Sequence, residues 1–437
     1  MLDVSGVPGA GRGERPGPAR HPVDDGNGAS MHDASLAADA ATVARQGGHH
    51  ALARALQASR TDTLATFGAY ERALAGLRVP LRTELNPPLW ELGHIGWFQA
   101  YWVQRNPQRE RGVRADPDTP RGPAQPADAD ALYHSGRVPH DSRWMLPLPD
   151  APATRAQLQR QLEATLALLA EAPDHDDALY FFRLALLHED MHHEAALYMA
   201  QGLGIAIDDP RWQARALPSP PPALNLPAGR WRLGSPEAAG FAFDNESPAV
   251  EVSVRACEID AQAVRWGEYL SFAEAGGYAQ PRWWAAAGRQ WLAESGARTP
   301  RYLRRDGSRW LQWRHGRWRA LDLAEAACHL THHEAQAWCR WAGRRLPGEA
   351  EWERAALTQG ARFRWGDVWE WTSSPFAPFP GFVAHPYRDY SAPWFDGRPV
   401  LRGASFMTQP RMRHARYRNF FQVGRNDVPA GFRSCTA

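Results

Sequence analysis

A proline-dense stretch, ALPSPPPALNLPAG at positions 216–229, divides this chain of 437 residues into two parts of different character. Proline fixes φ and has no amide hydrogen, so this stretch can form neither a helix nor a central strand. It suits a semi-rigid connector instead. A chain of this length can hold two or three domains, each with a core of its own. We therefore predict a Pro-rich linker at residues 206–225 and consider the two sides of it separately.

The part before the linker has the apolar periodicity of helices. Apolar residues recur at helical spacing in LARALQASRTDTLATF, in ELGHIGWFQAYWVQR and in RAQLQRQLEATLALLAEA. A stripe repeated every 3.6 residues predicts an amphipathic helix. We therefore predict a bundle of three or four long helices across residues 46–205. The Pro- and Asp-rich stretch RADPDTPRGPAQPADAD predicts a long loop between the second helix and the third.

Residues 1–45 are dominated by Gly, Ala, Pro, Asp and Arg, with almost no aromatic or β-branched side chains. They cannot bury enough surface to offset the entropy of ordering, so we predict a disordered tail. This tail has no basic segment followed by an apolar run, and nowhere in the chain do 18 consecutive apolar residues occur. A soluble cytoplasmic protein is therefore expected.

The part after the linker, residues 226–437, changes to short segments. GRWRLGS, AVEVSVRACEID and RPVLRGASF have the composition of strands, and HHEAQAWCRWAG has that of a helix. The Trp- and Arg-rich stretch 282–318 predicts a helix and a hairpin, with Trp in the core and Arg at the rim, in preference to a nucleic-acid surface. The fold class is therefore α+β, a helical bundle followed by a mixed domain.

Composition narrows the function. Lys+Arg 50 nearly balances Asp+Glu 48, which argues against a nucleic-acid binder or a polybasic membrane-surface protein and favours small-molecule partners. All of the positive charge is arginine, so chemistry that needs a lysine, such as a P-loop or a pyridoxal phosphate Schiff base, cannot operate. The 4 cysteines are scattered without CxxC spacing, and we expect them to be reduced.

The segment LALLHEDMHHEAALYMAQ carries a pair of histidines with metal-ligand spacing. His188 and His192 lie at i and i+4 beside a helical apolar stripe, so both imidazoles leave the helix on one face. His193 points about 100° away by the helical period and is the weaker candidate. Lone histidines are more often surface or hydrogen-bonded core residues, but the spacing of this pair favours a shared ion.

A third histidine lies far upstream, in NPPLWELGHIGWFQAYW. His94 is flanked by Gly93 and Gly96, small residues that allow close approach of another helix. A histidine in so apolar a segment needs a partner, and a metal ion is a good one. Three neutral histidines leave coordination positions open, which fits either a hydrolytic zinc or an oxygen-activating iron.

The same helix also spells H-E-x-x-H, the signature of zinc proteases in which the glutamate is the general base. The continuation H-x-x-G-x-x-H, which would supply a third ligand, does not follow His192. Spacing alone leaves zinc and iron open.

Ordered phrases in the second half decide between them. These are FDNE at 243–246, RLPGEAEWERAA at 345–356, GDVWEWT at 366–372, LRGASF at 401–406, RYRNFF at 416–421 and GFR at 431–433. With the three histidines, they resemble the ergothioneine, ovothiol and selenoneine synthases over residues 51–437. That family joins a DinB-like four-helix bundle to a domain similar to the formylglycine-generating enzyme, of C-type-lectin-like fold. The resemblance implies that His94, His188 and His192 bind Fe(II) and that O2 is a co-substrate.

The resemblance also implies the substrates. The family joins sulfur or selenium to the imidazole of histidine or of its trimethylated form, hercynine. Asn419, Phe420 and Phe421 occupy the segment that meets the trimethylammonium group, which aromatic faces hold best. The stretch FMTQPRMRHARYR lacks the two cysteines of formylglycine-generating enzymes, so that activity is not expected.

Departures from the family pattern refine the prediction. Phe421 stands where synthases that use γ-glutamylcysteine carry an acidic residue, and Met191 stands where many relatives carry glutamine. Several relatives have tyrosines after the WEWT phrase; this chain has phenylalanines there, and the nearest candidates for the unassigned proton donor are Tyr387 and Tyr390.

HEDMHHEAALYM and YHSGRVPHDSRWMLPLP resemble selenoneine synthases most, which use a selenosugar. We therefore predict a non-haem iron enzyme that forms a C–Se bond between hercynine and a selenosugar. The alternatives are ergothioneine-type C–S bond formation with γ-glutamylcysteine or cysteine, a zinc hydrolase, and a DinB-type binding module without turnover.

Overall fold

The computed structural model describes residues 40–237 and 240–437. The predicted tail overlaps this range, and there the prediction is wrong, because residues 40–46 are helical. Arg45 is buried and forms an ion pair with Glu246, with 2.8 Å between Nη1 and Oε2. A salt bridge to the C-terminal half thus holds residues whose composition alone predicts disorder. Residues 1–39, the rest of the predicted tail, lie outside the described residues.

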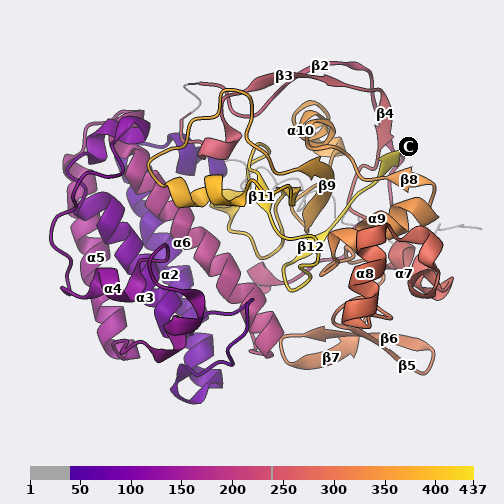
Figure 1. The fold of residues 1–437 in the computed structure, drawn as a ribbon, viewed down its shortest axis with the longest axis horizontal. Helices are drawn as coiled ribbons and strands as arrows, with labels where there is room; N and C mark the ends of the chain where they lie inside the picture. Colours follow the sequence, from indigo (N-terminus) through magenta and orange to yellow (C-terminus); the bar gives the residue numbers. More distant parts are fainter. Residues whose placement is uncertain (1–39, 238–239) are drawn as a thin grey trace, which may run out of the picture.

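Four long helices occupy the first half of the described chain, where the sequence predicted helices. They are α2 (His49–Ala73), α3 (Pro88–Gln99), α5 (Ala151–Glu171) and α6 (Asp176–Leu203). α2 packs against α6 and α3 packs against α5 and α6, as the left side of Figure 1 shows. The likeness of this bundle to DinB proteins stays a prediction.

Local interactions set the start of α5 and the end of α6, whereas α3 continues beyond its last α-helical turn. Asp150 caps α5 by accepting a hydrogen bond of 2.9 Å from the amide of Ala153. α6 ends at Gly204, whose φ of 74° is a left-handed conformation that suits glycine at a helix C-terminus. α3 does not end at Gln99 but continues as a π-helical turn, η2 (Ala100–Gln104).

The predicted loop between α3 and α5 contains short helical segments. These are η3 (Arg109–Arg114), α4 (Ala129–Tyr133) and η4 (His140–Met145). α4 packs on α3, so it adds to the wall around the helix that carries His94.

The second half is built from small sheets and short helices. The strands are β1 (Leu224–Leu226), β2 (Gly229–Leu233), β3 (Val250–Val254), β4 (Cys257–Ile259), β5 (Leu303–Asp306), β6 (Arg309–Arg314), β7 (Arg317–Ala320), β8 (Arg344–Arg345), β9 (Trp369–Pro375), β10 (Pro399–Gly403), β11 (Asn419–Phe420), β12 (Ala430–Gly431) and β13 (Cys435–Thr436). The helices are α7 (Trp266–Glu274), α8 (Ala286–Ser295), α9 (His332–Trp341) and α10 (Glu349–Thr358). The first half is helical and the second half mixes strands with short helices, which confirms the predicted α+β class.

Two four-stranded sheets form the centre of this half, in the orders β1-β4-β13-β8 and β11-β10-β9-β12. β12 runs parallel to β9, and the other pairings in both sheets are antiparallel. The three-stranded β5-β6-β7 sheet projects at the lower edge of Figure 1. It follows α8, so the Trp- and Arg-rich stretch forms the predicted helix and hairpin, extended by a third strand.

The predicted linker is packed rather than free. Trp212 and Leu217 are 3% and 4% exposed and belong to a cluster that also contains Tyr70 of α2. The backbone of Leu217 donates a hydrogen bond of 2.8 Å to the carbonyl of Ala324. Prolines prevent regular structure in this stretch but not burial, because its apolar side chains still gain from leaving water.

The two halves share one hydrophobic core. A single cluster of buried side chains includes Trp102 and Phe181 from the bundle and Trp369 and Trp371 from β9. The buried carboxylate of Glu194 on α6 accepts hydrogen bonds from the side chains of three residues of the second half, Trp369, Ser405 and Thr408, at 2.6, 2.9 and 2.8 Å. The metal-site helix is therefore fixed against the C-terminal sheet. No helix among the described residues is long and apolar enough to cross a membrane.

Candidate metal centre

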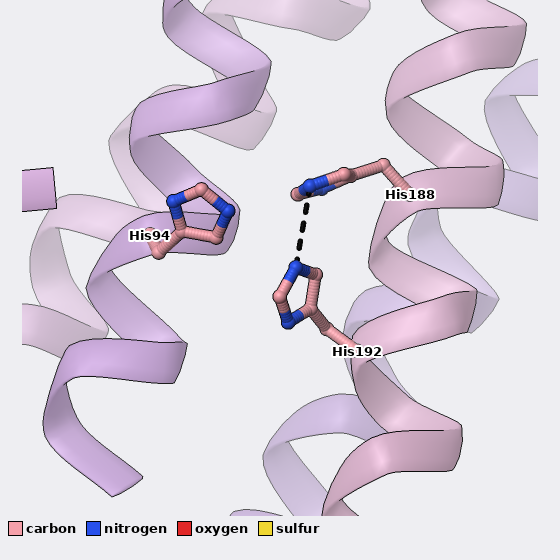
Figure 2. Close-up of side chains that lie close together, drawn as sticks. All are labelled: His94, His188 and His192. Carbon is pink, nitrogen blue, oxygen red and sulfur yellow. Dashed lines mark hydrogen bonds between the residues drawn. The ribbon is translucent and has the colours of Figure 1, made fainter. Parts of the chain in front are cut away.

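Three histidines from two helices converge at the side of the bundle core. His94 lies on α3, and His188 and His192 lie one turn apart on α6. One ring nitrogen from each lies within 4.8 Å of the others, and Figure 2 shows the three rings facing one another. Of the described residues, they are the one group found with metal-ligand geometry. The structure brings together the predicted ligands.

The glycines beside His94 allow close packing, but not against α6. A Cβ on Gly93 would lie 2.3 Å from the ring of Tyr133, and one on Gly96 would lie 2.1 Å from the amide of Gln161. The approach predicted from these glycines is therefore toward α4 and α5. α3 is pressed against them on one side and presents His94 on the other.

Hydrogen bonds fix the tautomers of two of the rings. Nδ1 of His94 donates to the carbonyl of Tyr133 at 2.8 Å, and Nδ1 of His192 donates to the carboxylate of Glu91. Each Nδ1 then carries the proton, so each Nε2 keeps a lone pair for a metal. Carbonyl and carboxylate partners of this kind are typical of metal-bound histidines.

The Nε2 atoms of His188 and His192 lie 3.2 Å apart, as the dashed line in Figure 2 marks. Among the described residues, Nδ1 of His188 has no hydrogen-bond partner. A cation between the Nε2 atoms would satisfy both lone pairs, whereas two unprotonated nitrogens at this distance repel each other. The donor set fits a divalent metal ion bound by imidazoles.

Aromatic stacking holds the rings in place. The ring of Phe98 stacks on His188 with a centroid distance of 3.5 Å and an interplanar angle of 4°. Trp90 stacks on His94 at 4.8 Å and 8°. Both partners lie on α3, so this helix orients its own histidine and one from α6.

Burial favours the neutral form of two of the three histidines, His94 and His188. It lowers the pKa of His94 to about 3, with a further decrease from His192 and a partial increase from the hydrogen bond to Tyr133. Burial also lowers the pKa of His188 well below its usual value, and the two other histidines add to this effect. Burial would raise the pKa of Glu91, but the adjacent His192 lowers it below its usual value. Near neutral pH His94 and His188 are therefore unprotonated and Glu91 is charged.

Three tyrosines from the second half, Tyr387, Tyr390 and Tyr417, form a wall beside the histidines. The ring of Tyr387, in the segment after β9, lies 4.9 Å from Phe98 and 6.2 Å from His188. The hydroxyl of Tyr390 donates a hydrogen bond of 2.9 Å to that of Tyr417, which in turn contacts the sulfur of Met191. The two halves therefore meet at the candidate metal centre.

The predicted substrate residues lie farther along this wall. Phe420 stacks on Phe376 at 4.1 Å and lies 6.2 Å from Tyr390. The guanidinium of Arg425 lies over the ring of Phe421, 5.2 Å from its centroid. The side-chain oxygen of Asn419 accepts from the amide of Phe420 at 2.8 Å. All three predicted residues are half-buried, and Phe420 connects to the histidines through the tyrosine wall.

Sequence comparisons identify relatives that match most of this chain. A hercynine oxygenase from Mycolicibacterium smegmatis is 31% identical over 418 residues, which cover 80% of this chain and 90% of the relative. One from Mycolicibacterium thermoresistibile is 31% identical over 440 residues, which cover 87% and 94%. The chain belongs to the hercynine oxygenase family. The family model of the sulfatase-modifying factor enzyme 1-like domain matches residues 210–367.

Part of this chain also matches a formylglycine-generating enzyme. The formylglycine-generating enzyme of Streptomyces coelicolor is 26% identical over 262 residues, which cover 46% of this chain and 82% of that enzyme. The mixed sheets and short helices of this hercynine oxygenase family member thus belong to a scaffold that also serves other enzymes.

The glutamate of the H-E-x-x-H phrase is engaged in a salt bridge. Arg60 donates to both carboxylate oxygens of Glu189, at 2.8 and 3.0 Å, and both side chains are 2% exposed. A zinc protease needs this glutamate free beside the metal-bound water. His193, the weaker ligand candidate, is bonded through its ring nitrogens to Thr66 at 2.9 Å and Gln409 at 3.2 Å. Neither residue faces the three histidines.

Two contacts of the site were not predicted. The carbonyl of Tyr133 is a backbone group, and no side-chain pattern identifies it. Glu91 had a weak signal, a carboxylate one turn before His94 in an otherwise apolar helix. Its carboxylate accepts the hydrogen bond from Nδ1 of His192.

Proposed function

We propose that this chain is an O2-dependent mononuclear non-haem Fe(II) enzyme that joins selenium from a selenosugar to the imidazole of hercynine. The observation that carries this proposal is the cluster of His94, His188 and His192, two of them buried and the third half-buried, in a chain with 31% identity to hercynine oxygenases. Small molecules are the expected partners, in the cytoplasm, with no role for nucleic acid or a membrane.

His94, His188 and His192 would hold Fe(II), which would supply open coordination positions for O2 and the two substrates. The protein's own side chains would orient the two substrates and O2 relative to one another and exclude bulk water. Phe98, Trp90 and the tyrosine wall, which is Tyr387, Tyr390 and Tyr417, enclose the site with aromatic side chains.

Recognition of hercynine needs apolar and aromatic surface, because a trimethylammonium group cannot donate hydrogen bonds. A ring face contributes about 0.5 to 2 kcal/mol to holding such a cation. Phe420, stacked on Phe376 and half-buried, offers such a face beside Asn419. We assign these residues to the hercynine side of the site.

Tyr387 is the residue that we propose to donate a proton. Burial raises the pKa of its hydroxyl, so the group stays protonated and can act as a donor. Its ring centroid lies 6.2 Å from that of His188, and among the described residues it is the tyrosine whose ring contacts this histidine. Tyr390, the other candidate from the sequence, instead bonds Tyr417.

The second substrate is the less constrained part of the proposal. Phe421 presents a ring rather than a carboxylate at the position that would pair with the ammonium group of γ-glutamylcysteine. Arg425 lies over this ring and forms an ion pair with Asp427 at 2.6 Å. Its guanidinium is therefore already engaged and does not offer an unpaired charge to a substrate carboxylate. A donor without an amino-acid head group, such as a selenosugar, suits this surface.

The test is an aerobic assay of the iron-loaded protein with hercynine and either a selenosugar or γ-glutamylcysteine. We expect O2 uptake and a C–Se product with the selenosugar. Product from γ-glutamylcysteine alone would move the assignment to ergothioneine-type C–S bond formation. No O2 uptake with either donor would contradict the proposed function.

Metal analysis of protein purified without added metal separates the remaining alternatives. Stoichiometric iron supports the proposal. Stoichiometric zinc with peptidase activity that Glu189→Gln abolishes would support a hydrolase, although the salt bridge of Glu189 with Arg60 argues against it. A bound metal that stabilises the protein without any turnover would support a binding module.

A further inference from the structure

Glu91 is a buried carboxylate at the metal centre that the mechanism above does not use. It lies on α3, one turn before His94, and is 8% exposed. Its Oε2 contacts Nδ1 of His192 on α6, 101 residues later in the chain. The two other carboxylates nearest to the ligands along α6, Glu189 and Asp190, are bonded to arginines.

We propose that Glu91 is a positioning residue of the metal centre. Its carboxylate accepts a hydrogen bond from Nδ1 of His192 and thereby points Nε2 of that ring toward the ion. This inference rests on the metal centre of the proposed function. Because Glu91 and His94 share α3, the contact also ties the two ligand-bearing helices together at the site. A carboxylate acceptor makes the imidazole a stronger donor to a cation than a neutral acceptor does.

A chain of contacts holds Glu91 itself. The side-chain amide of Asn86 donates to Oε1 of Glu91 at 2.5 Å, so both carboxylate oxygens are engaged. Arg143 donates to the side-chain oxygen of Asn86 at 2.9 Å, and its guanidinium lies 3.8 Å from the centroid of the Trp90 ring. A side chain held at both oxygens loses little further entropy when the metal binds.

The three ligands differ in how they are held, which gives Glu91 a distinct effect. Nδ1 of His94 meets a neutral carbonyl, and His188 is held by stacking on Phe98. Among the described residues, His192 is the ligand that a carboxylate contacts. Three neutral imidazoles leave the full charge of a divalent ion uncompensated, and Glu91, in contact with His192, is a negative charge placed to offset it.

Glu91 is not arranged as a fourth ligand. Both of its oxygens already have partners, and the cluster of atoms with metal-ligand spacing contains the three histidines without it. Its influence on the ion passes through His192, so its removal weakens binding without removing a bond to the metal.

The experiment measures metal affinity rather than turnover. Fe(II) or Co(II) is titrated anaerobically into Glu91→Ala, Glu91→Gln and the unmodified protein in competition with a chelator, and the visible spectrum of the Co(II) form is recorded. Removal of a hydrogen-bond partner of this kind weakens metal binding about 10- to 100-fold. We expect that loss for Glu91→Ala, with an altered Co(II) spectrum, and a smaller loss for Glu91→Gln, which keeps an acceptor oxygen.

A second variant and a matched control protect the test from folding effects. Asn86→Ala loosens Glu91 without touching a ligand and should weaken binding by less than Glu91→Ala does. Glu189→Gln makes the same chemical change at a buried carboxylate next to His188 that bonds Arg60 instead of a histidine. It should leave the metal dissociation constant within about threefold of the unmodified value, because it has no path to a ligand.

The outcomes separate this inference from the proposed function. If both Glu91 variants bind metal as tightly as the unmodified protein while His94→Ala does not bind, the role of Glu91 is wrong and the metal centre stands. If His94→Ala also binds metal normally, the centre itself is wrong and the inference fails with it.

Discussion

The indole Nε1 of Trp369 donates a hydrogen bond of 2.6 Å to the carboxylate of Glu194, two residues beyond His192 on α6. Trp369 begins β9, so this bond joins the metal-site helix to the central strand of the C-terminal sheet. The segment that follows β9 carries Tyr387 to the ring of His188. The buried carboxylate of Glu194 thus helps to hold the ligand-bearing helix against the half of the protein that carries the tyrosines.

Replacing Glu194 with alanine is expected to lower the free energy of unfolding strongly. The variant leaves Trp369, Ser405 and Thr408 without their acceptor, and each buried unsatisfied donor costs about 1 to 3 kcal/mol. Allowing for relaxation, we expect a loss of roughly 3 kcal/mol in urea denaturation. Glu163→Ala, at an exposed position of α5, is the control and should change stability by less than about 0.5 kcal/mol. Equal effects of the two changes would contradict the role of Glu194.

Each of His94→Ala, His188→Ala and His192→Ala is expected to remove stoichiometric metal, because each takes away one of three imidazole donors. The loss of affinity should exceed the roughly 100-fold upper effect of removing a ligand's hydrogen-bond partner. Metal content after gel filtration, measured by mass spectrometry, checks this. His193→Ala is the matched control: it removes a buried histidine of the same helix that bonds Thr66 and Gln409. Retained metal in any of the three ligand variants would argue against the site.

Tyr387→Phe is expected to lower product formation without changing metal affinity. A positioned proton donor contributes about 10²- to 10⁴-fold to rate, so a decrease in kcat of that size follows if Tyr387 donates the proton. Tyr101→Phe, on the π-helical turn after α3, is the control: it removes the hydroxyl of a tyrosine whose ring contacts Trp97 and His134. An unchanged kcat in Tyr387→Phe would transfer the role to another group.

The Arg45–Glu246 ion pair should make stability depend on acid. Burial would raise the pKa of Glu246, but the charge of Arg45 prevails and lowers that pKa from 4.5 to about 2. The folded-state pKa is the lower one, so the stabilisation is complete above about pH 4.5 and is lost as the pH falls toward 2. A shift of this size corresponds to roughly 3 kcal/mol at neutral pH.

Thermal melting of the unmodified protein and Glu246→Gln between pH 7 and pH 3 tests this expectation. The difference in Tm between them should shrink as the pH falls. Arg388→Ala, which breaks an exposed pair with Asp118, serves as the control and should change Tm little at any pH. A Tm difference that stays constant with pH would contradict the assigned coupling.

The extent to which sequence predicted this molecule depends on whether the determining contacts are local. The spacing of His188 and His192 is a local property of one helix, and the apolar context of His94 indicated a ligand because a buried imidazole needs a partner. The helices of the bundle followed from periodicity in the same way, and the helix and hairpin of residues 282–318 followed from composition. Composition was less reliable for residues 40–45, which are helical although their neighbours in sequence resemble a disordered tail.

The tertiary structure decided the contacts between segments that are distant in the chain. Glu91 meets His192, Arg45 meets Glu246 and Tyr387 meets His188 across 101, 201 and 199 positions, and no periodic pattern encodes such pairs. The sequence by itself determined the two-part organisation, the choice of three histidines as candidate metal ligands, and the helical spacing that places two of them on one face. Only folding determined which carboxylate orients His192, which glutamate is occupied by arginine, and which tyrosines cover the site. Local patterns report backbone geometry, whereas these contacts depend on how α3, α6 and the C-terminal sheet pack together.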